Sequence, residues 1–225
     1  MNSSADKRKN FLNAKSMLEK AGVPTAGILS QSYLRFEAAL STTTTLYTFD
    51  VLTNENQNPN LVTQNKLNVN DAFVISSIGI YVATAAGSTV GETNVKLFTF
   101  PDPQAFSTAN AATSLRTLYN GQLQLTVGQK VYIPAWDIQK HQKVTRTQNV
   151  VGATGGTAPL DSFDMSIDGV YPCEPNVTLV GNKTNKLQVQ LPGNLVAIEP
   201  NSRLVVVAYG ILAQGAVKLQ GGANL

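Results

Sequence analysis

Apolar residues recur at every second position over much of this chain, and this period constrains the fold more than any other feature. The alternation is clearest at residues 33–40, 47–51, 73–84 and 123–133, with segments rich in Thr, Asn, Gly or Pro between them. A β-strand points successive side chains to opposite faces, so each segment is predicted to be a strand with one buried face. Roughly nine to eleven such strands, separated by turn residues, indicate an all-β fold of the β-sandwich or jelly-roll type.

The sequence makes more specific predictions for two of these strands, the longest one at 73–84 and the last one at 203–213. In the long strand, Gly79 is expected at a bulge or at a close approach of another group. The last strand is so apolar that both of its faces should be covered. One face of the long strand is predicted to hold Val74, Ile78, Ile80 and Val82.

Two tight turns predict hairpins. Gly128-Gln129 lies between alternating residues of 123–127 and 131–133, and the segment 181–185 lies between those of 177–179 and 187–191. Gly and Asn favour the backbone conformations of short hairpin turns. We therefore expect the two strands that flank each turn to pair with one another.

Two segments have helical rather than strand periodicity. At the N-terminus, apolar residues recur at helical spacing over 6–21, and Gly22 and Pro24 should end this helix. A helix of this length is marginal alone, so it should dock on a neighbour or lie on a surface. A second, short helix is expected within 105–118, with Leu115 and Leu118 inward.

The net charge of +3 is confined to the predicted N-terminal helix. Five of the 17 Lys and Arg residues and two of the 14 Asp and Glu residues lie in the first twenty positions, so the other 205 carry twelve of each. A basic end on a neutral body is typical of a protein that assembles and touches an anionic partner. A helix that is solvated or docked locally is the alternative. The residues predicted to face nucleic acid or a membrane are Lys7, Arg8, Lys9, Lys15 and Lys20.

The rest of the composition also favours assembly. Charged residues make up only 14% of the chain, against about 25% in ordinary globular proteins. This deficit indicates surface buried in an oligomer, or else a surface rich in Asn, Gln, Thr and Ser. The single cysteine, Cys173, excludes an internal disulfide. No apolar stretch approaches the length of a spanning helix or follows the basic residues as in a secretion signal, so neither is expected.

The sequence contains no arrangement typical of catalysis. His141 is the only histidine, and no Gly-x-Ser-x-Gly nucleophile motif accompanies it. One His and one Cys are too few ligands for a structural zinc site. We therefore expect no enzymatic activity, no metal, no cofactor and no small-molecule substrate, and we expect His141 at the surface or in an interface.

A second basic cluster, within 130–146, has aromatic residues among its cations. Lysine and arginine beside aromatic rings serve nucleic-acid contacts, but Trp, Tyr and Arg are also favoured in protein interfaces. The Gln and Thr residues around this cluster favour the interface. The interface candidates are Lys130, Tyr132, Trp136, Lys140, His141, Lys143 and Arg146.

The layout of the chain resembles a known class of proteins. A short basic N-terminal arm, eight or more strands with long polar loops, few charges and the closing strand at 204–213 are together similar to jelly-roll viral capsid proteins. More narrowly, residues 73–84, the segment Leu-Tyr-Asn-Gly-Gln-Leu-Gln-Leu at 118–125, and the closing strand resemble structural proteins of bacteriophages, in particular the upright β-sandwich coat proteins of small lipid-containing phages. The resemblance implies a coat subunit that forms trimers or rings, with its N-terminal arm toward the particle interior.

Together these observations predict a short basic helical arm, 1–30, and a jelly-roll or β-sandwich body, 31–225, which could also be two compact barrels. The expected function is that of a non-enzymatic capsid protein, made in the host cytoplasm and located in the virion. Its expected partners are further copies of itself, other virion proteins, and nucleic acid or lipid headgroups in weak contact. The alternative is a phage fibre or decoration module, or a carbohydrate- or receptor-binding β-sandwich, with Tyr119, Tyr132 and Trp136 as stacking platforms.

Overall fold

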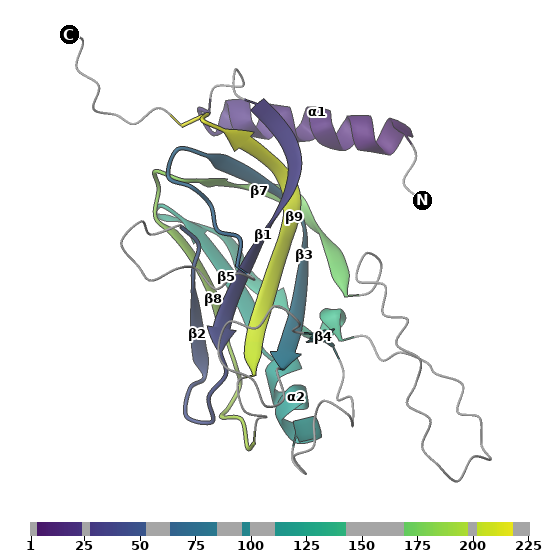
Figure 1. The fold of residues 1–225 in the computed structure, drawn as a ribbon, viewed down its shortest axis with the longest axis vertical. Helices are drawn as coiled ribbons and strands as arrows, with labels where there is room; N and C mark the ends of the chain where they lie inside the picture. The colour runs from purple at the N-terminus through teal and green to yellow at the C-terminus, as the bar shows by residue number, and fades with distance from the viewer. Residues whose placement is uncertain are drawn as a thin grey trace.

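The alternating segments form two antiparallel β-sheets that face each other (Figure 1). The computed structural model describes residues 4–23, 28–52, 64–84, 96–99, 111–142, 169–197 and 202–217. The all-β sandwich predicted from the alternation is confirmed.

The first sheet contains β1 (Ile28–Ala39), β9 (Arg203–Gln214), β3 (Ala72–Thr84), β4 (Lys96–Phe98) and β7 (Val170–Val180), in the order β1-β9-β3, with β4 and β7 both paired to β3. The second contains β2 (Leu46–Asp50), β8 (Asn185–Gln190), β5 (Gln122–Val127) and β6 (Lys130–Asp137), in the order β2-β8-β5-β6. Four strand pairs are nested along the chain, which means that each pair encloses the next in the sequence: β1·β9, β2·β8, β3·β7 and β5·β6. Two further pairs, β3·β9 and β5·β8, join them into the two sheets.

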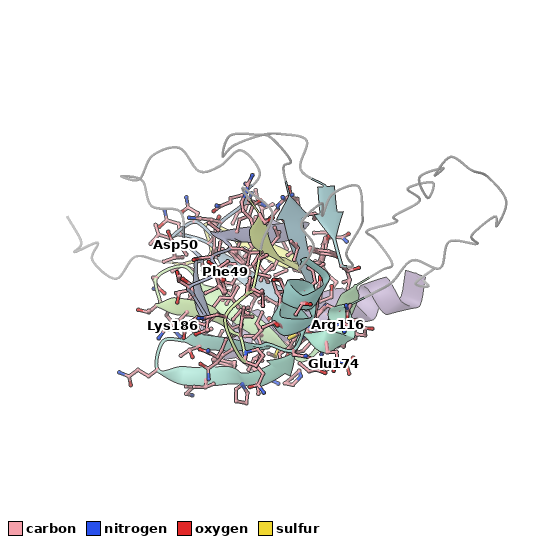
Figure 2. All side chains as sticks on the ribbon, turned by 90° about the horizontal axis from the view of Figure 1, so that it is seen from below. Phe49, Asp50, Arg116, Glu174 and Lys186 are labelled. Atoms are coloured by element: carbon pink, nitrogen blue, oxygen red, sulfur yellow. The ribbon has the colours of Figure 1, made fainter. Side chains whose placement is uncertain are left out.

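The main core lies between the two sheets, and Figure 2 shows side chains filling this layer. Phe36 and Phe73 from the first sheet and Phe49 and Leu123 from the second are almost fully buried there. The helix α2 (Ala111–Tyr119) contributes Leu115, Leu118 and Tyr119 to the same core at one end of the sandwich (Figure 1). The Tyr119 hydroxyl donates a hydrogen bond to the Ile80 carbonyl. Because Tyr119 is buried, it cannot be the exposed stacking platform that the alternative function required.

A register shift in β3 corrects one sequence prediction. The pairing of β3 with both β7 and β9 shifts between Ile75 and Ser77. One extra residue in a strand reverses which face the following side chains point to. Ile78 therefore faces the main core, whereas Val74 lies on the outer face, so placing Val74 on the same side as Ile78 was wrong.

Gly79 is a point of close approach, not the bulge. A Cβ atom at Gly79 would lie 2.7 Å from the ring and the hydroxyl oxygen of Tyr81. Both residues lie on the outer face of β3, where Tyr81 packs in a small cluster with Val205 and Val207 of β9. Since Leu204 and Val206 face the main core, β9 is covered on both faces, as its composition predicted.

Only one of the two predicted hairpins forms. β5 and β6 pair directly across a turn in which Gly128 has a φ of 62°, a conformation that favours glycine. The strands on either side of Gly181 do not pair, because β7 belongs to the first sheet and β8 to the second. Alternation fixes which face of a strand is buried, but it does not fix which strand lies beside it. The turn at 181–184 therefore carries the chain from one sheet to the other.

Candidate functional site

The basic N-terminal segment forms α1 (Ser4–Lys20), which crosses the outer face of the first sheet at the end of the sandwich opposite α2 (Figure 1). Ala14 and Leu18, four residues apart on one helix face, are buried against Val74, Val180 and other small apolar side chains. This contact stabilises a helix that would be marginal alone.

The C-terminal end of α1 is closed by a glycine motif. The amide of Val23 donates to the Leu18 carbonyl at 2.9 Å, and that of Gly22 donates to the Glu19 carbonyl at 3.0 Å. Gly22 has a φ of 75°, which a glycine adopts without strain. Val23 and Leu18 share the same apolar cluster, which is the usual companion of this motif. The end of α1 is thereby fixed to the sheet.

The other half of α1 continues past the edge of the sheet (Figure 1). Phe11 shares the helix face of Ala14 and Leu18, yet it is 41% exposed, and Leu12 is 54% exposed. Lys15 and Lys20 are exposed, so their charges are available to a partner. Of the remaining predicted contact residues, Lys7, Arg8 and Lys9 belong to α1, but their side chains lie outside the described part of the chain.

The second predicted surface is centred on a hydrogen bond between Trp136 and His141. Trp136 is half-buried near the end of β6, and His141 closes the short 3-10 helix η1 (Gln139–His141) that follows. The indole Nε1–H of Trp136 donates to Nε2 of His141 at 2.7 Å. Because an indole nitrogen can only donate, Nε2 accepts and Nδ1 carries the imidazole hydrogen. Nδ1 then donates to the carbonyl of Gly169 at 2.6 Å.

His141 is fully buried within the subunit, so its predicted position at the surface or in an interface was wrong. Both ring nitrogens are satisfied inside the protein by groups that the polar sequence around His141 did not reveal. Burial lowers the pKa of His141 from 6.5 to about 4, although the hydrogen bond to Gly169 opposes this shift. The imidazole is therefore neutral at pH 7.

Lys140 covers the aromatic side of this cluster. Its Nζ lies 3.0 Å from the centroid of the Trp136 ring and 5.6 Å from that of Tyr171, which are cation–π distances. Burial lowers the pKa of Lys140, while nearby Asp137 opposes that change. The Tyr171 ring meets the His141 ring edge to face, with centroids 5.2 Å apart. Three predicted residues, Trp136, Lys140 and His141, are thus brought together.

Gly169 and Tyr171 complete the cluster, and sequence reasoning missed both. They come from β7 and the residue before it, about thirty positions further along the chain, and no local pattern connects them to Trp136. The other predicted residues are separate from the cluster. Lys130 and Tyr132 are exposed at the opposite end of β6, an edge strand among the described strands, and Lys143 and Arg146 lie outside the described residues.

Among the residues the structure describes, no three His, Cys, Asp or Glu side chains gather where they could hold a metal ion. No helix in this part of the chain is long and apolar enough to cross a membrane. Comparisons with protein-family models, curated proteins and solved structures found no match to this chain.

Proposed function

We propose that this protein is a non-enzymatic virion structural protein, a capsid subunit with a jelly-roll body that assembles with copies of itself. In this proposal the basic helix α1 marks the side of the subunit that faces the genome or the membrane in the particle interior. The observation that carries the proposal is the nested pairing of the strands.

An eight-stranded jelly roll is an antiparallel ribbon rolled up so that its strands divide between two sheets. The first strand of such a ribbon pairs with the last, the second with the seventh, and so on inward. If the short β4 is set aside, the pairs β1·β9, β2·β8, β3·β7 and β5·β6 follow this order. Viral capsid proteins, lectins and cupins are all built on this architecture, so the fold narrows the function without fixing it.

The distribution of charge favours the capsid within this group. Five of the six outward residues on the central strands β5 and β8 are uncharged, among them Gln122, Gln124, Gln188 and Gln190, and Lys186 is the exception. Such depletion of charge is typical of the centre of protein interfaces. By contrast, the charges of α1 are too few for strong nucleic-acid binding by one subunit. They become effective when many copies present them on one side of a shell.

A carbohydrate- or receptor-binding module is the second candidate, and exposed Tyr132 favours it. Tyr132 is 47% exposed on an edge strand. However, the Trp136 ring that this function would also use is covered by the Lys140 ammonium group, and its N–H is engaged by His141. Glycan binding that disappears in a Trp136→Ala variant with an intact fold would favour this candidate.

The proposal is tested by measuring self-assembly and the contribution of the basic residues of α1 to anion binding. Light scattering and electron microscopy of the purified full chain should find rings, trimers or shells. A variant with Lys7, Arg8, Lys9, Lys15 and Lys20 all changed to Gln should still assemble, because Ala14 and Leu18 still dock α1. Its salt-dependent binding to DNA or to anionic vesicles should weaken, with the slope of log K against log salt on duplex DNA reduced by about 0.9 per lost phosphate contact.

The matched control is Lys183→Gln, which removes an exposed lysine from the turn between β7 and β8. It should leave both assembly and salt dependence unchanged. A chain that stays monomeric at high concentration would contradict the assembly. If the variant with all five substitutions binds DNA and vesicles as the wild type does, the role given to α1 is contradicted.

A further inference from the structure

Three charged side chains meet on the outer face of the first sheet, away from both surfaces described above. Leu34 and Phe36 of β1 face the main core, so Arg35 and Glu37 point to the opposite side. In β9, Leu204 faces the core and Arg203 therefore shares the outer face with them. The two strands are paired, with Glu37 opposite Val205, which places Arg203 beside the glutamate.

Glu37 is held by both arginines. Nε of Arg35 donates to Oε1 of Glu37 at 2.8 Å, and Nη1 of Arg203 donates to Oε2 at 2.6 Å. The Glu37 and Arg203 side chains are 0% and 4% exposed, whereas that of Arg35 is 17% exposed. The cluster is therefore buried, with one solvent-facing side at Arg35.

The cluster contains two cations and one anion. Nη2 of Arg203 is buried and has no hydrogen-bond partner. Nη2 of Arg35 lies 2.8 Å from the Glu37 oxygen that Nε already uses, and it too makes no hydrogen bond. Within the described residues, no second carboxylate pairs with either arginine. A buried donor without an acceptor is unfavourable, and so is a buried charge without a counter-charge. One bound anion would supply both the missing hydrogen-bond acceptor and the missing negative charge.

We infer that Arg35 and Arg203 form a binding site for one oxyanion, a carboxylate or a phosphate, on the outer face of the first sheet. A guanidinium group presents its N–H donors as a planar fork that matches the oxygens of these anions. The bound anion would accept hydrogen bonds from Nη2 of Arg203, which has no partner, and from Nη2 of Arg35, whose one close oxygen is already used by Nε. A bound carboxylate would bring the cluster to neutrality, and a phosphate would carry it to a negative charge. Glu37 would keep both arginines oriented toward it. This inference does not rest on the proposed function.

The experiment titrates the full-length protein with inorganic phosphate and, separately, with acetate, with sodium chloride adjusted to hold ionic strength constant. Two readouts are followed: the midpoint of thermal unfolding and the NMR signals of the arginine Nε–H groups. We expect a saturable rise in the midpoint and a shift of two arginine signals with at least one anion. An effect of phosphate alone would identify a phosphate site, and an effect of acetate alone would identify a carboxylate site.

Variants locate the effect. Arg203→Gln should weaken anion binding by about tenfold or more, because it removes a charged donor, and Arg203→Lys should restore the charge but not the fork, giving intermediate binding. Glu37→Gln retains both guanidinium groups and raises the net charge of the cluster, so it should bind the anion more tightly than the wild type. The control Lys183→Gln should bind as the wild type does.

The NMR titration of the wild type needs no variant to fold, so it keeps the test decisive if Arg203→Gln is unstable. The inference is overturned if neither anion shifts an arginine signal saturably. It is also overturned if a folded Arg203→Gln variant retains wild-type affinity.

Discussion

The single histidine should make this protein sensitive to acid. In the folded chain the pKa of His141 is lowered from 6.5 to about 4 by burial. The unfolded chain therefore binds a proton that the folded chain does not, over the interval between these two values. The stability associated with neutral His141 is fully present above pH 6.5 and is lost as the pH falls toward 4.

The size of the effect follows from the two pKa values. Each pH unit within the interval changes the free energy of unfolding by up to about 1.4 kcal/mol. For pKa values of 6.5 and about 4, the loss due to His141 is about 2 kcal/mol at pH 5 and about 3 kcal/mol at pH 4. This is a large part of the total stability of an ordinary domain.

The geometry gives the reason for this loss. A proton added to the ring must go on Nε2, because Nδ1 already donates to Gly169. Nε2 would then become a donor facing the donor Nε1 of Trp136, and their hydrogen bond would be lost. The ammonium group of Lys140 also opposes the added charge, while Asp137 favours it.

Two measurements check this prediction. Because the chain has one histidine, its ring proton signal in a ¹H NMR titration reports the pKa directly. Urea unfolding at several pH values, at one protein concentration, should show a steeper loss of stability for the wild type than for His141→Gln, whose side chain does not titrate. A His141 pKa of 6.5 or higher, or equal pH dependence in the two proteins, would refute the reasoning.

Two substitutions test the packing of the first sheet. Gly79→Ala should lower the free energy of unfolding by about 1–3 kcal/mol, because the added Cβ would lie 2.7 Å from Tyr81. The control Gly193→Ala, whose Cβ would have nothing within 4 Å, should have little effect. Urea unfolding measures both variants, and equal effects would contradict the packing around Gly79. Leu18→Ala should weaken the docking of α1 by about 2–3 kcal/mol, which hydrogen exchange would detect as faster amide exchange in the helix. The control Leu12→Ala, at an exposed position, should not change the exchange. Unchanged exchange in Leu18→Ala would show that α1 does not depend on this contact.

Sequence periodicity was sufficient to locate the strands, but not to predict which strands pair with each other. Burial on one face repeats every two residues, so the sequence pattern locates strands such as β2, β3 and β5 and identifies β9 as covered on both sides. Pairing between strands depends on contacts between residues far apart in the chain, which periodicity does not contain. For this reason the hairpin across Gly181 was wrong, and the shift near Ser76 reversed the predicted side of Val74.

The candidate site was predictable only in part, for a related reason. Trp136 and Lys140 are close in sequence, so a local pattern could bring them together. His141 lies in a polar segment, and its burial depends on Gly169 and Tyr171, which are remote in sequence. Likewise, Arg35 and Glu37 alternate with core residues as solvated side chains do, and only the pairing of β1 with β9 places Arg203 beside them.

The pairing of β1 with β9 also sets an order on how the protein can form during its synthesis. Ile28 pairs with Gln214, so among the described strands the first to leave the ribosome is the partner of the last. β9 further separates β1 from β3, and the first sheet therefore has no centre until the C-terminal strand is available. The β5–β6 hairpin can close early because its strands are adjacent in the chain, but the pairing of β1 with β9 must wait until β9 has been synthesised. Until then the edges of β1 and β3 that pair with β9 are open, and unpaired strand edges of this kind make an incompletely folded chain prone to aggregation.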